Sequence, residues 1–89
     1  MFKAAQQGET KAQFNLGVSY LNGTGVNRDL NEGYFWIFLA KTRTSESGLK
    51  VYAENTLESL SKNMKKNDIK IAQKRAQVWL NEHPAKPEQ

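Results

Sequence analysis

The stretch that decides the fold is Ala12-Gln13-Phe14-Asn15-Leu16-Gly17-Val18-Ser19-Tyr20-Leu21, followed by Asn22-Gly23-Thr24-Gly25-Val26. Apolar residues occupy every second position from 12 to 20, which is the period of a half-buried strand, and Asn-Gly is a common hairpin turn. A helix also fits, because its apolar residues fall on two opposite faces. One face would carry Ala12, Leu16 and Tyr20, and the other would carry Phe14, Val18 and Leu21. Such a helix is packed between neighbours. The stretch alone leaves strand and helix open.

The residues that follow this stretch are typical of a helix start. Asp29 is suited to cap a helix, and Glu32, three residues later, can reach back to the backbone N–H of Asp29 in a capping box. Residues 34–40 are apolar all round, which predicts a largely buried helix. Gly33 lowers helix stability by up to about 1 kcal/mol relative to Ala. A glycine at this position therefore indicates that a neighbouring helix packs closely against it. Residues 42–48 are small and polar and predict a connection.

The second half of the chain predicts two further helices. The first has one apolar face made of Leu49, Ala53, Leu57, Leu60 and Met64. The second starts at Asn67-Asp68 and has an apolar face made of Ile69, Ala72, Ala76, Trp79 and Leu80. Pro84 and Pro87 are expected to end it. The predicted core residues of the whole chain are Leu16, Tyr20, Trp36, Leu57 and Trp79.

A known repeat pattern resolves the disputed stretch in favour of a helix. In register, the chain resembles the Sel-one-like repeat family, relatives of tetratricopeptide repeats, at Ala12, Leu16, Gly17, Tyr20, Gly23, Gly25, Val26, Asp29, Trp36 and Ala40. The likeness covers residues 4–44, and it departs at Gly33, where the family usually has alanine. It implies that Gly17 allows a close helix approach, that Gly23 ends the first helix in a left-handed conformation, and that Gly25 turns the loop.

The resemblance implies an all-α fold: a right-handed helix-turn-helix solenoid of about four helices in two hairpins. Residues 1–8 look like the end of a preceding repeat helix or an N-terminal cap, and residues 9–44 form one repeat. Residues 45–83 resemble a degenerate capping helix pair, and residues 84–89 are expected to be a disordered tail. The chain is therefore interpreted as a C-terminal fragment of a longer array or as a very short member.

Composition narrows the function classes. Eighty-nine residues allow one small domain, and the absence of cysteine with a single histidine, His83, argues against thiolate sites, multi-histidine metal sites and histidine-based triads. We therefore expect no cofactor and no enzyme activity. The net charge of +4 weakly favours acidic partners. The longest apolar run, residues 34–40, is too short to span a bilayer, and no signal peptide is visible. A cytoplasmic protein is expected, or a periplasmic one if the chain is a fragment.

Three clusters carry possible chemistry beside a simpler interpretation. Glu54 and Glu58 lie four apart like an acid–base pair, but lysines at the same spacing favour a solvated face. His83 lies near the C-terminus and is a weak candidate ligand. A basic cluster can hold an acidic protein or nucleic acid, although an ordinary exposed helix is the simpler interpretation; its members are Lys62, Lys65, Lys66, Lys70, Lys74 and Arg75.

The resemblance also points to a binding surface, because in tetratricopeptide-like units the first helix of each pair lines the concave face. By register, the candidate partner-binding residues are Lys11, Phe14, Asn15, Val18, Asn22, Tyr52, Asn55, Ser59, Lys62 and Asn63. The leading hypothesis is a non-enzymatic protein-interaction module, an adaptor or scaffold of bacterial type. The alternatives are an immunity or inhibitor protein that occludes a toxin and, with less support, a basic nucleic-acid-binding domain.

The N-terminal edge is expected to self-associate. Residues 1–8 cannot supply a full helix hairpin, so Phe2, Phe14 and Val18 would face a groove with missing walls unless these N-terminal residues cover them. We expect association end to end or by exchange of the first helix.

Overall fold

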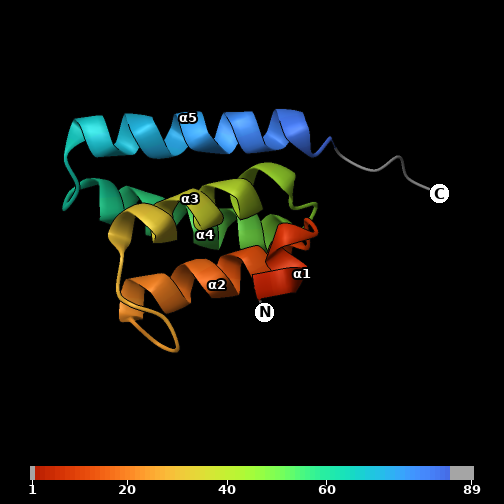
Figure 1. Ribbon diagram of the computed structural model, residues 1–89, viewed down its shortest axis with the longest axis horizontal. Helices are drawn as coiled ribbons and strands as arrows, with labels where there is room; N and C mark the ends of the chain where they lie inside the picture. The colour runs from red at the N-terminus through yellow and green to blue at the C-terminus, as the bar shows by residue number, and fades with distance from the viewer. Residues whose placement is uncertain (1, 85–89) are drawn as a thin grey trace.

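The computed structural model describes residues 2–84, which form five α-helices and, within that range, no strand (Figure 1). The helices are α1 (Phe2–Gln6), α2 (Thr10–Asn22), α3 (Leu30–Arg43), α4 (Ser47–Ser61) and α5 (Lys66–Glu82). The all-α class is confirmed, and the disputed stretch is helical. The expectation of about four helices is one too few, because residues 2–6 form a short helix of their own.

Helix α3 is the centre of the fold. Helices α2, α4 and α5 all pack against it, and α1 packs against α2. Figure 1 shows α2 and α5 on opposite sides of α3. This position explains the unbroken apolar run of α3, since a helix surrounded by others is apolar on every side. Its buried residues are Gly33, Tyr34, Phe35, Trp36, Ile37, Leu39 and Ala40.

Helix α2 is packed on two faces, as its alternating sequence predicts. Ala12 and Leu16 are buried in one core cluster, whereas Phe14 packs against the other from the opposite side. The helix ends at Gly23, whose φ of 72° is left-handed and whose N–H donates to the Ser19 carbonyl. Gly25 also has a positive φ, 75°. The turn roles of both glycines are confirmed.

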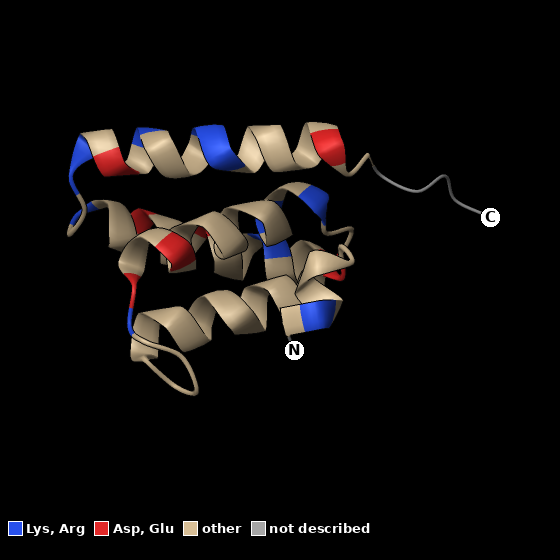
Figure 2. Cartoon of the chain, in the orientation of Figure 1, with Lys and Arg blue, Asp and Glu red and all other residues tan. Residues whose placement is uncertain are grey.

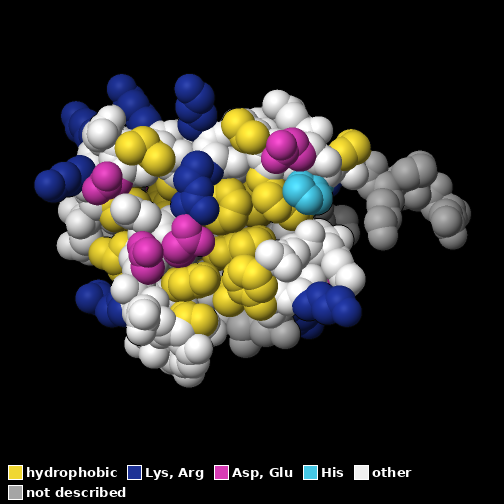
Figure 3. Space-filling model, in the orientation of Figure 1, with side chains coloured by type: hydrophobic (Ala, Val, Ile, Leu, Met, Phe, Trp, Pro, Cys, Tyr) yellow, Lys and Arg dark blue, Asp and Glu magenta, His cyan; other side chains and the backbone are white. Residues whose placement is uncertain are grey.

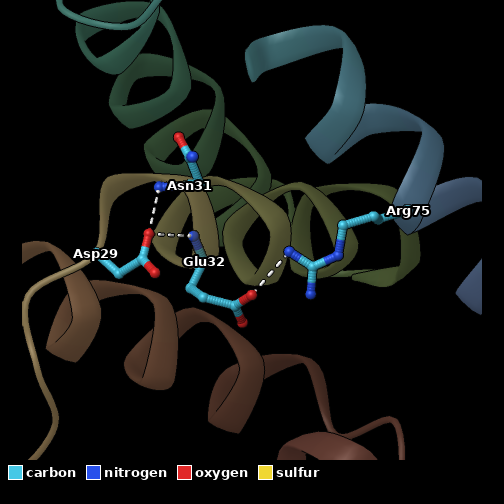
Figure 4. Close-up of polar contacts among 4 residues, drawn as sticks. All are labelled: Asp29, Asn31, Glu32 and Arg75. Carbon is cyan, nitrogen blue, oxygen red and sulfur yellow. Dashed lines mark hydrogen bonds and ion pairs between the residues drawn. The ribbon is translucent and has the colours of Figure 1, made fainter.

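Asp29 caps α3, but the second half of the expected capping box is not formed. An Asp29 carboxylate oxygen accepts hydrogen bonds from the N–H groups of Asn31, at 3.0 Å, and Glu32, at 3.2 Å (Figure 4). The N–H of Asp29 donates instead to the Tyr20 carbonyl, at 2.9 Å. The Glu32 carboxylate turns to α5 and forms an ion pair with Arg75, at 2.7 Å. Arg75 on a distant helix therefore binds the Glu32 side chain that the local sequence pattern assigns to the cap.

The core consists of two clusters on the two sides of α3. One gathers residues of α1, α2, α3 and α5, and the other joins α3 to α4 and α5. The burial predicted for Leu16, Trp36 and Leu57 is confirmed. Tyr20 and Trp79 are only half-buried and pack against the edge of the first cluster, so they border the core rather than fill it.

Helix α1 folds back on the α2–α3 pair. Ala5 is fully buried, and its carbonyl accepts a hydrogen bond from the buried Gln13 side chain at 3.1 Å. The Phe2 ring lies edge-on to Trp36, with centroids 5.9 Å apart. The expectation that residues 1–8 leave this edge without a wall is therefore wrong for the described residues, because α1 supplies one.

Several boundaries differ from the sequence prediction. The connection expected at 42–48 shrinks to residues 44–46, because α3 continues to Arg43 and α4 begins at Ser47. Helix α5 begins at Lys66 without a side-chain cap, one residue before the predicted Asn67-Asp68 start, and it ends before Pro84 as predicted. Of the predicted tail at 84–89, only Pro84 lies within the described residues.

Candidate functional site

The candidate binding residues meet where α2 passes α4. The rings of Phe14 on α2 and Tyr52 on α4 are perpendicular, with centroids 5.4 Å apart. This contact joins the two predicted sets into one surface, which we call the α2–α4 face. Phe14 is half-buried against the second core cluster, so this candidate binding residue presents only part of its ring to solvent. The exposed aromatic residue of the face is Tyr52, which is 65% exposed.

The α4 side of this face is a shallow groove. Tyr52, Asn55, Thr56 and Ser59 line it, at the i, i+3, i+4 and i+7 spacing of one helix face. Thr56 was not among the predicted residues; its hydroxyl donates to the Tyr52 carbonyl at 2.9 Å. The same spacing from Tyr52 could have identified it.

The remaining candidates surround this groove less closely. On α2, Lys11, Asn15 and Asn22 are exposed and Val18 is half-buried. Lys11 lies in the first turn of α2 and Asn22 is its last residue, so the two are at opposite ends of the helix. Helix α4 ends at Ser61, which places Lys62 and Asn63 in the turn after the helix rather than on its face. The centre of the site is therefore Phe14 with Tyr52, Asn55 and Ser59.

The candidate acid–base residues lie on α4, apart from the candidate ligand His83, which follows α5. Glu54 and Glu58 are both exposed and line one shallow pocket together with Tyr34 and Lys41. The His83 ring stacks on Trp79, with centroids 4.1 Å apart and an angle of 13° between the planes, and its Nδ1 lies 2.9 Å from the Trp79 carbonyl oxygen. Within residues 2–84, no three His, Cys, Asp or Glu side chains are grouped to hold a metal ion.

The basic cluster divides into two kinds of side chain. Lys62, Lys65, Lys66, Lys70 and Lys74 are exposed. Figure 2 shows where Lys and Arg positions fall along the chain, including those on α5 and in the turn before it. Arg75 differs, because it pairs with Glu32 and lies over the Phe35 ring, 4.4 Å from the centroid. Arg75 therefore fastens α5 to α3, while the lysines remain available to a partner.

Two exposed aliphatic residues were missed by the sequence reasoning. Ile71 and Val78, on the outer side of α5, are 50% and 49% exposed. Their seven-residue separation, two helical turns, was a signal for one shared stripe. The apolar face predicted for this helix is the inner one, where Ala72 and Ala76 are buried.

Comparisons of the chain with protein-family models, with curated proteins and with solved structures find no match. The likeness to Sel-one-like repeats therefore rests on the ten positions of the sequence pattern. None of the helices in residues 2–84 is both long enough and apolar enough to cross a membrane.

Proposed function

We propose that this protein is a non-enzymatic protein-interaction module, an adaptor or scaffold repeat that binds its partner through the α2–α4 face. The observation that carries the proposal is the contact between Phe14 and Tyr52. It supports one side of an exposed tyrosine ring with a second, half-buried ring. Exposed tyrosines that are held in place supply large contact areas at low entropic cost, and they are enriched at the centres of protein interfaces.

The polar surroundings of Tyr52 fit the same role. Asn55 and Ser59 line the groove beside it, and Asn15 is exposed on α2. Amide and hydroxyl groups donate and accept hydrogen bonds without the desolvation penalty of a charge. The arrangement provides an aromatic anchor with neutral hydrogen-bonding groups around it, which suits a polypeptide better than a charged small molecule.

We also propose that the helices are arranged as repeat hairpins, α2 with α3 as one Sel-one-like unit and α4 with α5 as a degenerate closing unit. Two contacts support this arrangement. The first helices of the two units meet through Phe14 and Tyr52, and the second helices, α3 and α5, pack against each other. Stacked helix hairpins make these two kinds of contact between neighbours.

The test is affinity capture with matched variants of the full chain. The parent protein, Tyr52→Ala and Val51→Ala are immobilised separately and exposed to extract of the source cell. Val51 is the control because it is adjacent on α4 and 55% exposed. We expect a protein that the parent and Val51→Ala retain equally and that Tyr52→Ala retains at least tenfold less. Equal retention by all three variants would contradict the proposal, and loss of the signal after nuclease treatment would favour a nucleic-acid ligand.

A further inference from the structure

A groove along α5, where the helix borders α3, forms a second candidate surface, separate from the α2–α4 face. Ile71, Val78 and Trp79 of α5 line it together with Phe35 of α3, and we call it the α5 groove. In Figure 3, hydrophobic side chains gather on this side of the molecule beneath α5. Ile71 and Val78 are each about half-exposed, although the inner face of the same helix already packs in the core. Two aliphatic side chains therefore remain exposed to solvent on a helix that is already packed in the core on its other face.

The spacing of these side chains suits a helical partner. Ile71 and Val78 are seven residues apart, so they are separated by about 10 Å along the helix axis. A second helix lying along the groove presents its own apolar side chains at the same two-turn interval. The buried Phe35 and half-buried Trp79 provide an apolar floor beside them.

The charged side chains at the groove favour a partner with negative charge. Lys74 and Arg75 both line the groove between the two aliphatic residues, and Lys70 and Lys66 continue along α5 from Lys74 at four-residue spacing. Glu82 lines the other end of the groove, four residues beyond Val78, so the positive charge is concentrated on the N-terminal side of α5. Glu32 already neutralises Arg75. The three lysines have no ion-pair partner within residues 2–84. A partner whose acidic side chains face Lys74 and Lys70 would form ion pairs with these lysines.

The same charges disfavour a second copy of this chain. An antiparallel pair that sets Ile71 of one copy against Val78 of the other also sets Lys74 against Arg75. A parallel pair sets Lys74 against Lys74. The parallel pair brings two unpaired lysines together at the centre of the contact, which opposes association. The antiparallel pair is opposed less strongly, because Glu32 already pairs with Arg75. An anionic membrane is a poorer fit as well, because the apolar part is a narrow groove rather than the broad face of an interfacial helix.

We propose that the α5 groove binds an acidic amphipathic helix of a partner protein, with aliphatic anchors on Ile71 and Val78 and carboxylates on Lys74 and Lys70. The proposal is independent of the α2–α4 face, because it uses none of the same side chains. A module with both surfaces can hold two partners at once, which is what a scaffold requires.

Two designed peptides test the proposal. Both carry leucines at i, i+4 and i+7 of one helix face; one has glutamates beside them and the other has lysines at the same positions. Titration into isotope-labelled protein is followed by the backbone amide signals. We expect the acidic peptide to shift the signals of residues 70–79 and the basic peptide to leave them unchanged. A further expectation is that Ile71→Ser with Val78→Ser weakens binding at least tenfold, while Val51→Ser has no effect.

Charge reversal supplies a test that does not depend on the aliphatic side chains. Lys74→Glu should weaken the acidic peptide at least tenfold, whereas Lys50→Glu makes the same change in net charge on exposed α4 and should have a much smaller effect. Tyr52→Ala should leave peptide binding unchanged, so failure here and failure of the proposed function are distinguishable.

Four results would overturn the proposal. These are equal binding of both peptides, shifts centred on the α2–α4 face, a dimer that Ile71→Ser dissociates, and binding to anionic phospholipid vesicles without binding to the acidic peptide. Equal binding would show contact without charge selection, and shifts on the α2–α4 face would show another binding site. A dimer, or binding to vesicles alone, would show that the groove binds a second copy of the chain or a lipid surface.

Discussion

Gly17 of α2 and Gly33 of α3 face each other across the point where the two helices come closest. A Cβ atom added to Gly17 would lie 3.0 Å from the Gly33 carbonyl oxygen, and one added to Gly33 would lie 3.1 Å from the Gly17 carbonyl oxygen. The relationship is reciprocal, so each glycine makes room for the backbone of the other helix. The close packing that the sequence indicated at both positions is confirmed.

Replacing either glycine with alanine is therefore expected to destabilise the protein, although alanine is the better helix former by about 1 kcal/mol. At Gly17 the new methyl group would also lie 2.5 Å from Cγ1 of the fully buried Ile37, and at Gly33 it would overlap the Leu21 side chain. Overpacking of this kind costs about 1–3 kcal/mol. Urea unfolding followed by circular dichroism measures the change.

Gly48→Ala is the matched control for these two variants. Gly48 also lies in a helix, α4, but a Cβ there would meet no atom within 4 Å. We expect no loss of stability and a gain of up to about 1 kcal/mol from helix propensity. If Gly17→Ala and Gly33→Ala were as stable as Gly48→Ala, the helices would not be in the close contact described.

Leu57→Ala tests the second core cluster. Leu57 is 6% exposed and packs between α4 and α3, so truncation should leave a cavity and lower the free energy of unfolding by about 2–5 kcal/mol. Val51→Ala, on the exposed side of the same helix, should change it by less than about 0.5 kcal/mol. A loss below about 0.5 kcal/mol for Leu57→Ala would place Leu57 on the surface and shift the register of α4.

The elements that local patterns specify were predictable from the sequence. Asp29 before an apolar run predicted the start of α3, and Gly23 predicted the end of α2, because caps depend on neighbouring residues. The choice of helix over strand at 12–21 needed the repeat pattern, since an alternating sequence also fits a helix with two packed faces. Phe14 on one face and Leu16 on the other now account for that alternation.

The features that depend on distant residues were not predictable. Glu32 satisfies a local cap rule in the sequence, but Arg75, 43 positions away, takes its carboxylate. In the sequence, Gln13 is one of the polar residues that alternate with apolar ones from 12 to 20. In the fold it is fully buried, because α1 folds back and the Ala5 carbonyl accepts a hydrogen bond from its side chain. The candidate site was anticipated as a set of residues. The contact between Phe14 and Tyr52, which organises it, depends on how α2 passes α4.

Asp29→Ala and Glu32→Gln separate the cap of α3 from the ion pair between α3 and α5. Asp29→Ala removes the acceptor of two backbone N–H groups and should lower stability by about 1 kcal/mol. Glu32→Gln leaves that acceptor in place and weakens a partly exposed ion pair, so its effect should be smaller and should shrink further in high salt. Unfolding of both variants at low and high salt measures this. A salt-independent loss in Glu32→Gln as large as that of Asp29→Ala would indicate an intact capping box.

Self-association through the N-terminal edge stays a prediction although α1 supplies a wall there, because Phe2 is left 46% exposed at that edge. Phe14 is not suited to test it, since Phe14 packs against the second core cluster and Phe14→Glu should also unfold the protein. The Phe2 ring lies edge-on to the buried Trp36, while Phe2 itself stays about half-exposed at the start of α1. We expect light scattering to show concentration-dependent association that Phe2→Glu abolishes while helix content is kept. If the parent chain stays monomeric at high concentration, the contact of α1 with α2 is a sufficient cap for that edge.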